Sequence, residues 1–291
     1  MAFRILIAFI IFTYIFLMLI IGRYLTYLDL FLPRKKPNGK IELTEYAYED
    51  IEFQSPDDLT LRGWFIRSKN NPENKTLFIV PGWTRTRSRY LHQIKFFVDN
   101  GYHVFTYDQR SHGASDTGRI TFGPNEGRDL ITAVQYATDK LGINRNKIGA
   151  VGFSLGAISI IYAAKTQLFK AVVLEGVFSN SYDMGEAILL SKVGKKLTKF
   201  IGYAFFWVGA MVWTLGKYKH TSPVDHIGQV SPTPILLIRG NNDQTVPAYS
   251  AEKMINALRE PKEIWVHDSG HTWAFDAYPT EYKKRVLGFI N

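Results

Sequence analysis

Serine, aspartate and histidine, the residue types that together perform nucleophilic catalysis, occur in that order along this chain of 291 residues. Ser154 lies in Gly152-Phe153-Ser154-Leu155-Gly156, a G-x-S-x-G pattern between a strand-like run and a helix-like run. A serine hydroxyl is a weak nucleophile at neutral pH and needs a histidine base that a carboxylate orients. Backbone N–H groups at the start of the following helix can stabilise an oxyanion. The pattern therefore predicts acyl transfer through Ser154.

The acid and the base are expected in two late loops. Asp243 follows the predicted strand 234–239, and His271 follows the predicted strand 263–266. The carboxyl ends of parallel strands meet at one edge of a sheet, where ligands bind. We therefore expect Asp243 and His271 to converge on Ser154.

Other histidines and acids compete for these roles. The chain has seven histidines. Of those near the last strand, His267 is the weaker candidate for the base because it still belongs to the strand. Asp268 is the weaker candidate for the acid because it precedes His271 by only three residues.

The predicted elements form an α/β fold with a mostly parallel, eight-stranded sheet and helices on both faces. Apolar, β-branched runs alternate with helical patterns after an opening hairpin, which is typical of such sheets. The expected strands cover residues 50–54, 60–66, 76–80, 103–107, 147–153, 171–174, 234–239 and 263–266. The expected helices cover residues 87–99, 126–140, 154–166, 247–259 and 279–290.

Four segments together resemble serine hydrolases of the α/β-hydrolase superfamily, of the serine-aminopeptidase-like type and close to a membrane-anchored branch. They are the G-x-S-x-G pattern, the loop from Gly240 to Pro247, Ser269-Gly270-His271, and the segment from Tyr107 to Ser115. The last resembles a Y-D-x-R-x-x-G-x-S motif whose Asp and Arg, here Asp108 and Arg110, are usually structural. The resemblance covers about residues 45–291 and implies the α/β-hydrolase fold with a catalytic triad.

The resemblance also implies an oxyanion hole made of two backbone N–H groups. One comes from Leu155, directly after the nucleophile. The other follows a His-Gly pair in the family; here the pair is Pro81-Gly82, so the donor would be Trp83. Backbone donation survives the change from His to Pro, and the bulky Trp83 is expected to restrict the acyl side of the pocket.

The net charge of +9 is unevenly distributed. Residues 1–40 carry +5 and residues 192–219 carry +6, which leaves −2 on the rest of the chain. A nucleic-acid enzyme more often spreads basic residues over its folded body. We therefore expect no nucleic-acid partner and a lipid membrane as a partner instead.

Residues 5–21 contain no charged side chain. With its neighbours this run reaches about 20 residues, the length that a helix needs to cross a bilayer. No small-x-small cleavage site follows it, which favours an uncleaved single-pass anchor over a signal peptide. The basic flank downstream favours a cytoplasmic catalytic domain in the cell membrane.

The sheet pattern stops over about residues 178–230, which we interpret as a helical cap. Inside it, residues 200–216 carry no charge and have lysines on both sides. A second membrane crossing would separate Ser154 from Asp243 and His271, so this run is either a cap helix that dips into the membrane interface or a buried lid helix. Its bulky apolar residues would line a substrate pocket that favours an apolar acyl group, and the candidates are Phe205, Phe206, Trp207, Met211 and Trp213.

Three arginines, Arg85, Arg87 and Arg89, follow the proposed oxyanion donor. They suit either an anionic group of the substrate or, as the more ordinary interpretation, a solvated start of a helix.

The organisation that we expect is an anchor with its flank over residues 1–31, a basic linker over 32–44 and a hydrolase domain over 45–291. We expect a serine hydrolase that cleaves an ester or thioester in a small-molecule acyl substrate. The alternatives are a serine peptidase that acts on short peptides and a non-catalytic membrane scaffold. No metal or cofactor is expected, because the metalloprotease, Walker A and dinucleotide-binding patterns do not occur.

Overall fold

A computed structural model describes residues 4–9, 12–17, 20, 45–180, 183 and 222–291. The chain divides into two compact units, residues Met1–Leu32 with Tyr182–His220 and residues Pro33–Ser181 with Thr221–Asn291. In the first unit, the described residues 4–9, 12–17 and 20 are helical. No helix among the described residues has both the length and the apolar character that a membrane span requires. Part of the predicted span at 5–21 and the apolar part of the cap lie outside the described residues.

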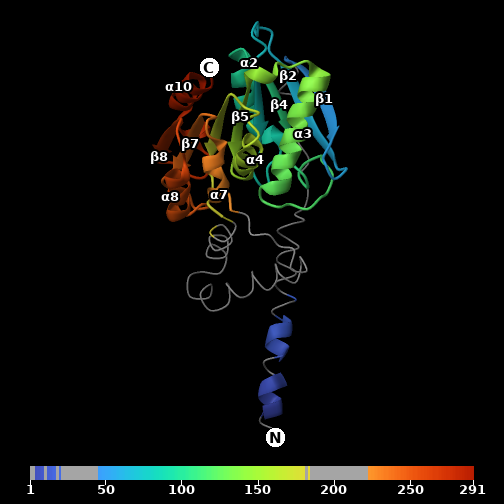
Figure 1. Cartoon of the computed structure of the whole chain (residues 1–291), viewed down its shortest axis with the longest axis vertical. Helices are drawn as coiled ribbons and strands as arrows, with labels where there is room; N and C mark the ends of the chain where they lie inside the picture. Colours follow the sequence, from blue (N-terminus) through green and yellow to red (C-terminus); the bar gives the residue numbers. More distant parts are fainter. Residues whose placement is uncertain (1–3, 10–11, 18–19, 21–44, 181–182, 184–221) are drawn as a thin grey trace. The chain divides into compact units, whose positions relative to one another are not determined.

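The second unit contains an eight-stranded sheet with the order β1-β2-β4-β3-β5-β6-β7-β8 (Figure 1). Strands β1 and β2 form an antiparallel hairpin, β2 pairs antiparallel with β4, and every other pairing is parallel. The eight predicted strands are confirmed, with ends that differ by no more than three residues. Their bounds are β1 Ala47–Gln54, β2 Thr60–Arg67, β3 Thr76–Val80, β4 His103–Tyr107, β5 Ile148–Phe153, β6 Ala171–Glu175, β7 Ile235–Gly240 and β8 Lys262–His267.

Helices cover both faces of this sheet (Figure 1). One face carries α2 (Leu91–Asp99) and α10 (Pro279–Ile290). The other carries α4 (Leu155–Ala164) and α3 (Pro124–Leu141), which pack against each other, and α3 also contacts β1. The short α7 (Val224–Ile227) contacts both α4 and α8 (Ala248–Ala257). The remaining helices are short: η2 Arg87–Tyr90, η3 Arg145–Lys147, η5 Gly228–Val230 and α9 Ala274–Ala277.

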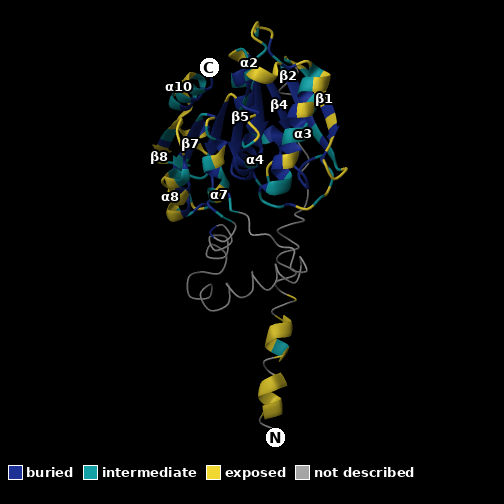
Figure 2. Cartoon of the chain, in the orientation of Figure 1, coloured by how far each residue is buried: buried dark blue, intermediate teal, exposed yellow. Residues whose placement is uncertain are grey.

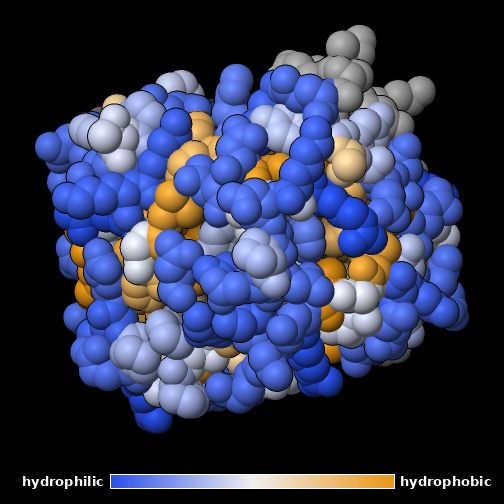
Figure 3. Space-filling model, turned by 90° about the horizontal axis from the view of Figure 1, so that it is seen from above, coloured by the Kyte–Doolittle hydropathy of each residue, from blue (hydrophilic) through white to orange (hydrophobic). Residues whose placement is uncertain are grey.

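Burial explains which sequences form the central strands. All five residues of β3 and all five of β6 are buried, whereas the edge strand β1 has only two buried residues (Figure 2). A strand that is covered on both faces reads as a continuous apolar run, and an edge strand does not. The face seen from above is mostly hydrophilic (Figure 3). Most of the large apolar side chains described in the second unit are buried.

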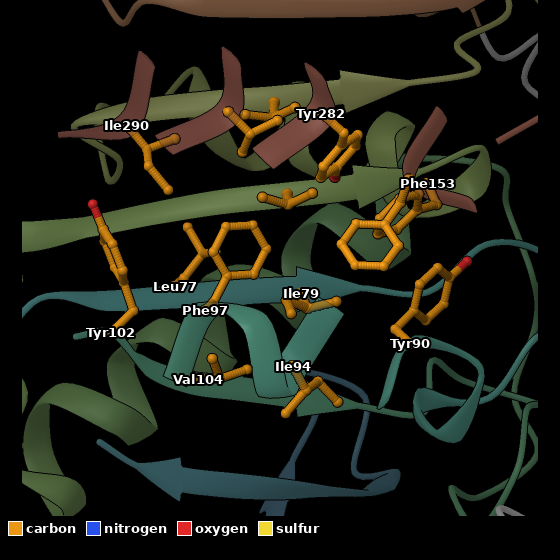
Figure 4. Packing of buried hydrophobic residues seen from close by; sticks show 14 of the residues in the cluster. Leu77, Ile79, Tyr90, Ile94, Phe97, Tyr102, Val104, Phe153, Tyr282 and Ile290 are labelled. Carbon is orange, nitrogen blue, oxygen red and sulfur yellow. The ribbon is translucent and has the colours of Figure 1, made fainter. Parts of the chain in front are cut away.

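An aromatic pair connects the core to the end of β5, next to Ser154. Tyr90 stacks on Phe153 with ring centroids 4.3 Å apart (Figure 4). The Tyr90 hydroxyl also accepts a hydrogen bond from the N–H of Gly82 at 3.2 Å. Phe153 directly precedes Ser154, and Gly82 directly precedes Trp83. The same buried ring therefore holds the nucleophile strand and the proposed oxyanion loop.

Candidate active site

Ser154 lies in a strained turn between β5 and α4. Its backbone has φ 52° and ψ −116°, which is an unfavourable region for a residue with a side chain. A Cβ on Gly152 would lie 2.6 Å from the N of Ala157, and one on Gly156 would overlap the carbonyl oxygen of Val80. Both glycines of the G-x-S-x-G pattern are thus required for the strand and helix to approach each other. Such strain, held by the surrounding packing, is typical of functional sites.

Asp243 and His271, which the sequence predicts to be the acid and the base, lie in direct contact. The His271 Nδ1 lies 2.6 Å from Asp243 Oδ2, and the side chains are 18% and 7% exposed. The other carboxylate oxygen, Oδ1, accepts hydrogen bonds from the N–H groups of Thr245 and Val246 at 2.7 and 2.8 Å. A carboxylate held in this way orients the imidazole and keeps a proton on Nδ1, so that Nε2 can act as a base.

Backbone hydrogen bonds join two loops that we call the acid loop and the base loop after their predicted roles. The acid loop, residues 241–247, contains Asp243, and the base loop, residues 268–273, contains His271. Asn241 donates its N–H to the carbonyl of His267 at 2.7 Å, and Asn242 donates to the carbonyl of Ser269 at 3.2 Å. A Cβ on Gly240 would lie 2.7 Å from the carbonyl oxygen of Gly270 and would overlap that of Ser269, so only glycine permits this approach. The pairing of the two loops fixes the separation between the carboxylate and the imidazole.

The end of β6 brings Ser154 and His271 to one place. Ser154 donates its N–H to the carbonyl of Glu175 at 2.8 Å, and a Cβ on the next residue, Gly176, would lie 2.8 Å from Cε1 of His271. Within the described residues, no hydrogen bond joins the Ser154 hydroxyl to the His271 ring. Catalytic hydrogen bonds are often long in enzymes without substrate and shorten when substrate binds.

The proposed oxyanion donors lie beside the nucleophile. Leu155 is the first residue of α4, and a Cβ on Gly82 would lie 2.9 Å from the carbonyl oxygen of Phe153, which places Trp83 next to the elbow. In the described part of the chain, neither the N–H of Trp83 nor that of Leu155 has a hydrogen-bond acceptor. The Trp83 ring packs edge-on against Phe122 with centroids 5.6 Å apart, giving the loop an apolar wall.

Two residues that the sequence analysis did not single out support the oxyanion loop. Gln109 donates to the carbonyl of Pro81 at 2.6 Å and accepts from the Ser159 hydroxyl at 2.9 Å. His112 accepts the N–H of Thr84 on Nε2 at 3.0 Å, and its Nδ1 lies 2.8 Å from the carbonyl of Arg110. Burial lowers the pKa of His112, which favours the neutral ring that this pair of contacts requires. Both residues lie in the Y-D-x-R-x-x-G-x-S segment, and this motif is the only feature of the sequence that indicates a role for them.

The Asp and the Arg of this segment, Asp108 and Arg110, are structural, as the resemblance implied. Arg110 binds Asp129 through two hydrogen bonds of 2.7 Å, and both side chains are 1% exposed. Asp108 is fully buried, and burial raises its pKa. It accepts from the N–H groups of Arg87 and Ala114 and forms an ion pair with the Arg87 guanidinium.

The interpretation of the arginine cluster as a solvated helix start is wrong for Arg87. Its side chain is buried and lies over the Trp64 ring at 4.5 Å, while it pairs with Asp108. Arg89 forms a more exposed ion pair with Asp276 at 2.6 Å, and Arg85 is exposed. The cluster is therefore divided between the core and the surface: Arg87, the first residue of η2, is buried, whereas Arg85 and Arg89 are not.

The competing residues near the last strand, His267 and Asp268, make other side-chain contacts. His267 is buried at the end of β8, and its Nδ1 lies 2.9 Å from the hydroxyl of Ser269. Burial lowers its pKa. Asp268 accepts from the side chain of Asn241 at 2.8 Å. The predicted pocket residues Phe205, Phe206, Trp207, Met211 and Trp213 lie outside the described residues.

With this geometry established, comparison with known proteins decides the family. The prolyl oligopeptidase family model matches residues 88–291. The chain belongs to the prolyl oligopeptidase family. This membership supports the α/β-hydrolase fold and serine hydrolase chemistry, and the narrower placement in a serine-aminopeptidase-like, membrane-anchored branch stays a prediction.

The chain is also similar to individual proteins, by sequence or by structure. The uncharacterised protein YfhR of Escherichia coli (strain K12) is 25% identical over 254 residues, which cover 84% of this chain and 81% of that protein. The uncharacterised peptidase YuxL of Bacillus subtilis is 23% identical over 82% of this chain and 37% of that protein. Among solved structures, the Pyrococcus furiosus esterase Pf2001 has a TM-score of 0.72 and 25% identity, covering 89% of this chain and 96% of that one.

Proposed function

We propose that this chain is a membrane-anchored serine hydrolase that cleaves carboxylic esters or thioesters with Ser154, His271 and Asp243. The observation that carries the proposal is the contact of His271 with a carboxylate that two backbone N–H groups hold, beside a serine in a strained turn. Family membership and the similarity to an esterase structure support the same class of reaction.

The proposed reaction proceeds through an acyl-enzyme. The Ser154 Oγ attacks the substrate carbonyl carbon while Nε2 of His271 takes its proton, and the N–H groups of Trp83 and Leu155 stabilise the oxyanion. The oxyanion collapses, the bond to the leaving group breaks, and His271 gives the proton to the departing oxygen or sulfur, which leaves as an alcohol or thiol. Water then attacks the acyl-enzyme with His271 as its base, releasing the acid and regenerating Ser154.

An apolar acyl group fits the described part of the site. The Trp83–Phe122 pair lies next to the proposed oxyanion donor, and the predicted cap residues would extend this apolar lining. Each buried methylene contributes up to about 0.8 kcal/mol, or roughly fourfold in affinity. For p-nitrophenyl esters, we therefore expect kcat/KM to rise from acetate to octanoate, with Ser154→Ala as the blank.

A serine peptidase is the second candidate, because the matching family and the relative YuxL are named for peptidase activity. Aminoacyl p-nitroanilides assayed beside the esters distinguish the two. Ester cleavage that rises with chain length, together with negligible anilide cleavage, supports the esterase. A flat or falling ester profile with Ser154-dependent anilide cleavage contradicts it and supports the peptidase.

The proposed membrane attachment rests on the uncharged run at residues 5–21 and on the basic residues that follow it. We expect the full chain to stay in the membrane pellet after alkaline carbonate extraction, and a chain without residues 1–31 to move to the supernatant. Recovery of the full chain in the supernatant would contradict the anchor.

A further inference from the structure

The dipeptide Glu175-Gly176 at the end of β6 contacts all three segments that carry the proposed triad. The carbonyl of Glu175 accepts the N–H of Ser154 at 2.8 Å, and the N–H of Gly176 donates to the carbonyl of Ile238 on β7 at 3.1 Å. The Glu175 side chain accepts the N–H of Ala274 at 2.9 Å, three residues after His271. Strand β7 leads to Asp243, so one dipeptide joins the nucleophile, the acid loop and the base loop.

Gly176 leaves the space that the His271 ring occupies. Its φ of +72° favours glycine, and a Cβ there would lie 2.8 Å from Cε1 and 3.1 Å from Nδ1 of His271. The same Cβ would lie 2.9 Å from Cγ2 of Thr272. Any larger residue at this position would have to push the base away from its place.

Glu175 is an unusual side chain for its location. It is 1% exposed, and its Oε2 has no hydrogen-bond partner among the described residues. Burial is the main cause that raises the pKa of Glu175 to about 7. The charges of Asp276 and Asp243 also raise this pKa, whereas the hydrogen bond from Ala274 and the charge of Arg89 lower it. Burial raises the pKa of Tyr90 and Tyr282, and the nearby charge of Glu175 adds to that rise. A buried polar atom without a partner destabilises the fold, so packing alone does not explain this residue.

We propose that Glu175 and Gly176 are positioning residues that set the His271 ring between Asp243 and Ser154. Glu175 acts through the backbone of Ala274, and Gly176 acts by leaving room for the ring. Asp243 remains the acid of the triad because it contacts Nδ1 of His271 directly. This inference rests on the proposed function, because a positioned base matters only if His271 is the base.

Two full-length variants, Glu175→Ala and Glu175→Gln, distinguish the effect of the hydrogen bond from Ala274 from the effect of the Glu175 charge. The Gln variant keeps a carbonyl oxygen that can accept the Ala274 N–H, whereas the Ala variant removes it. A base displaced by about 1 Å costs roughly 10²-fold in rate. We expect Glu175→Ala to lose about that factor in kcat with a smaller change in KM, and Glu175→Gln to recover most of it. Unchanged kcat in Glu175→Ala, or an equal loss in both variants, would overturn the proposal.

Gly176→Ala tests the steric part, and Gly142→Ala is its matched control. Gly142 has a similar φ of +68°, but a Cβ there would meet nothing within 4 Å. Both substitutions introduce the same kind of backbone strain, and only the first displaces His271. We expect a kcat loss of about 10²-fold in Gly176→Ala and no loss in Gly142→Ala. Equal losses, or a Gly176→Ala variant with wild-type kcat, would contradict the steric role.

Hydrogen exchange distinguishes a failure of this inference from a failure of the proposed function. An inactive wild-type chain would contradict the proposed function. The hydrogen bond from Ala274 to Glu175 can still be tested in that case, through the exchange rate of the Ala274 amide. We expect faster exchange in Glu175→Ala than in the wild type and in Glu175→Gln. Equal exchange rates in the wild type and both variants would overturn the positioning role of Glu175, whether or not the chain is active.

Discussion

Replacing Ser154 with alanine is expected to lower kcat for ester hydrolysis by at least about 10⁴-fold, because the acyl-enzyme can no longer form. The fold should survive, since the side chain is small and the turn is held by Gly152, Gly156 and the Glu175 carbonyl. Steady-state kinetics on the best p-nitrophenyl ester, with a thermal unfolding curve for each variant, measure both effects.

The control for this experiment is the combination with His271→Ala. Residues that act as one unit have strongly non-additive effects on kcat. We therefore expect the kcat of the double variant to lie within about tenfold of the kcat of the slower single variant. If the two losses multiply, Ser154 and His271 act independently, and the proposed nucleophile–base pair is wrong.

Asp243→Asn is expected to lower kcat by about 10⁴-fold while leaving the fold intact. An asparagine can still accept the N–H groups of Thr245 and Val246 on its oxygen. Its amide nitrogen would then face Nδ1 of His271 and donate to it, which moves the imidazole proton to Nε2. An imidazole with that tautomer cannot take the proton of Ser154. The kcat at pH 8 and the unfolding temperature are the measurements.

Asp268→Asn is the matched control, because Asp268 lies on the neighbouring loop and binds the side chain of Asn241 instead of His271. We expect its kcat to stay within about threefold of the wild type, as for an exposed polar contact. If Asp268→Asn is the slower variant, the acid is assigned to the wrong loop.

The strands and the nucleophile turn could be predicted from the sequence because their physical signals are local. Buried parallel strands such as β3 and β6 are short apolar runs, and the glycines around Ser154 mark a strained strand–helix turn. Asp243 and His271 were predicted from chain order and from the rule that parallel strands end at one edge of the sheet. The contact between them at 2.6 Å agrees with that reasoning.

What could not be predicted depends on contacts between distant segments. Arg87 resembles a surface arginine in sequence, and only the fold shows that it is buried and pairs with Asp108. Glu175 ends an apolar strand, and its partner Ala274 lies 99 residues away. His112 is one of seven histidines, and its role follows from the N–H of Thr84.

The most direct test of the central claim is covalent labelling of the full-length chain with a fluorophosphonate, followed by peptide mass spectrometry. We expect one adduct, on Ser154, that is lost in Ser154→Ala, strongly slowed in Asp243→Asn and unchanged in Asp268→Asn. A folded wild-type chain that stays unlabelled, or an adduct that persists in Ser154→Ala, would contradict it.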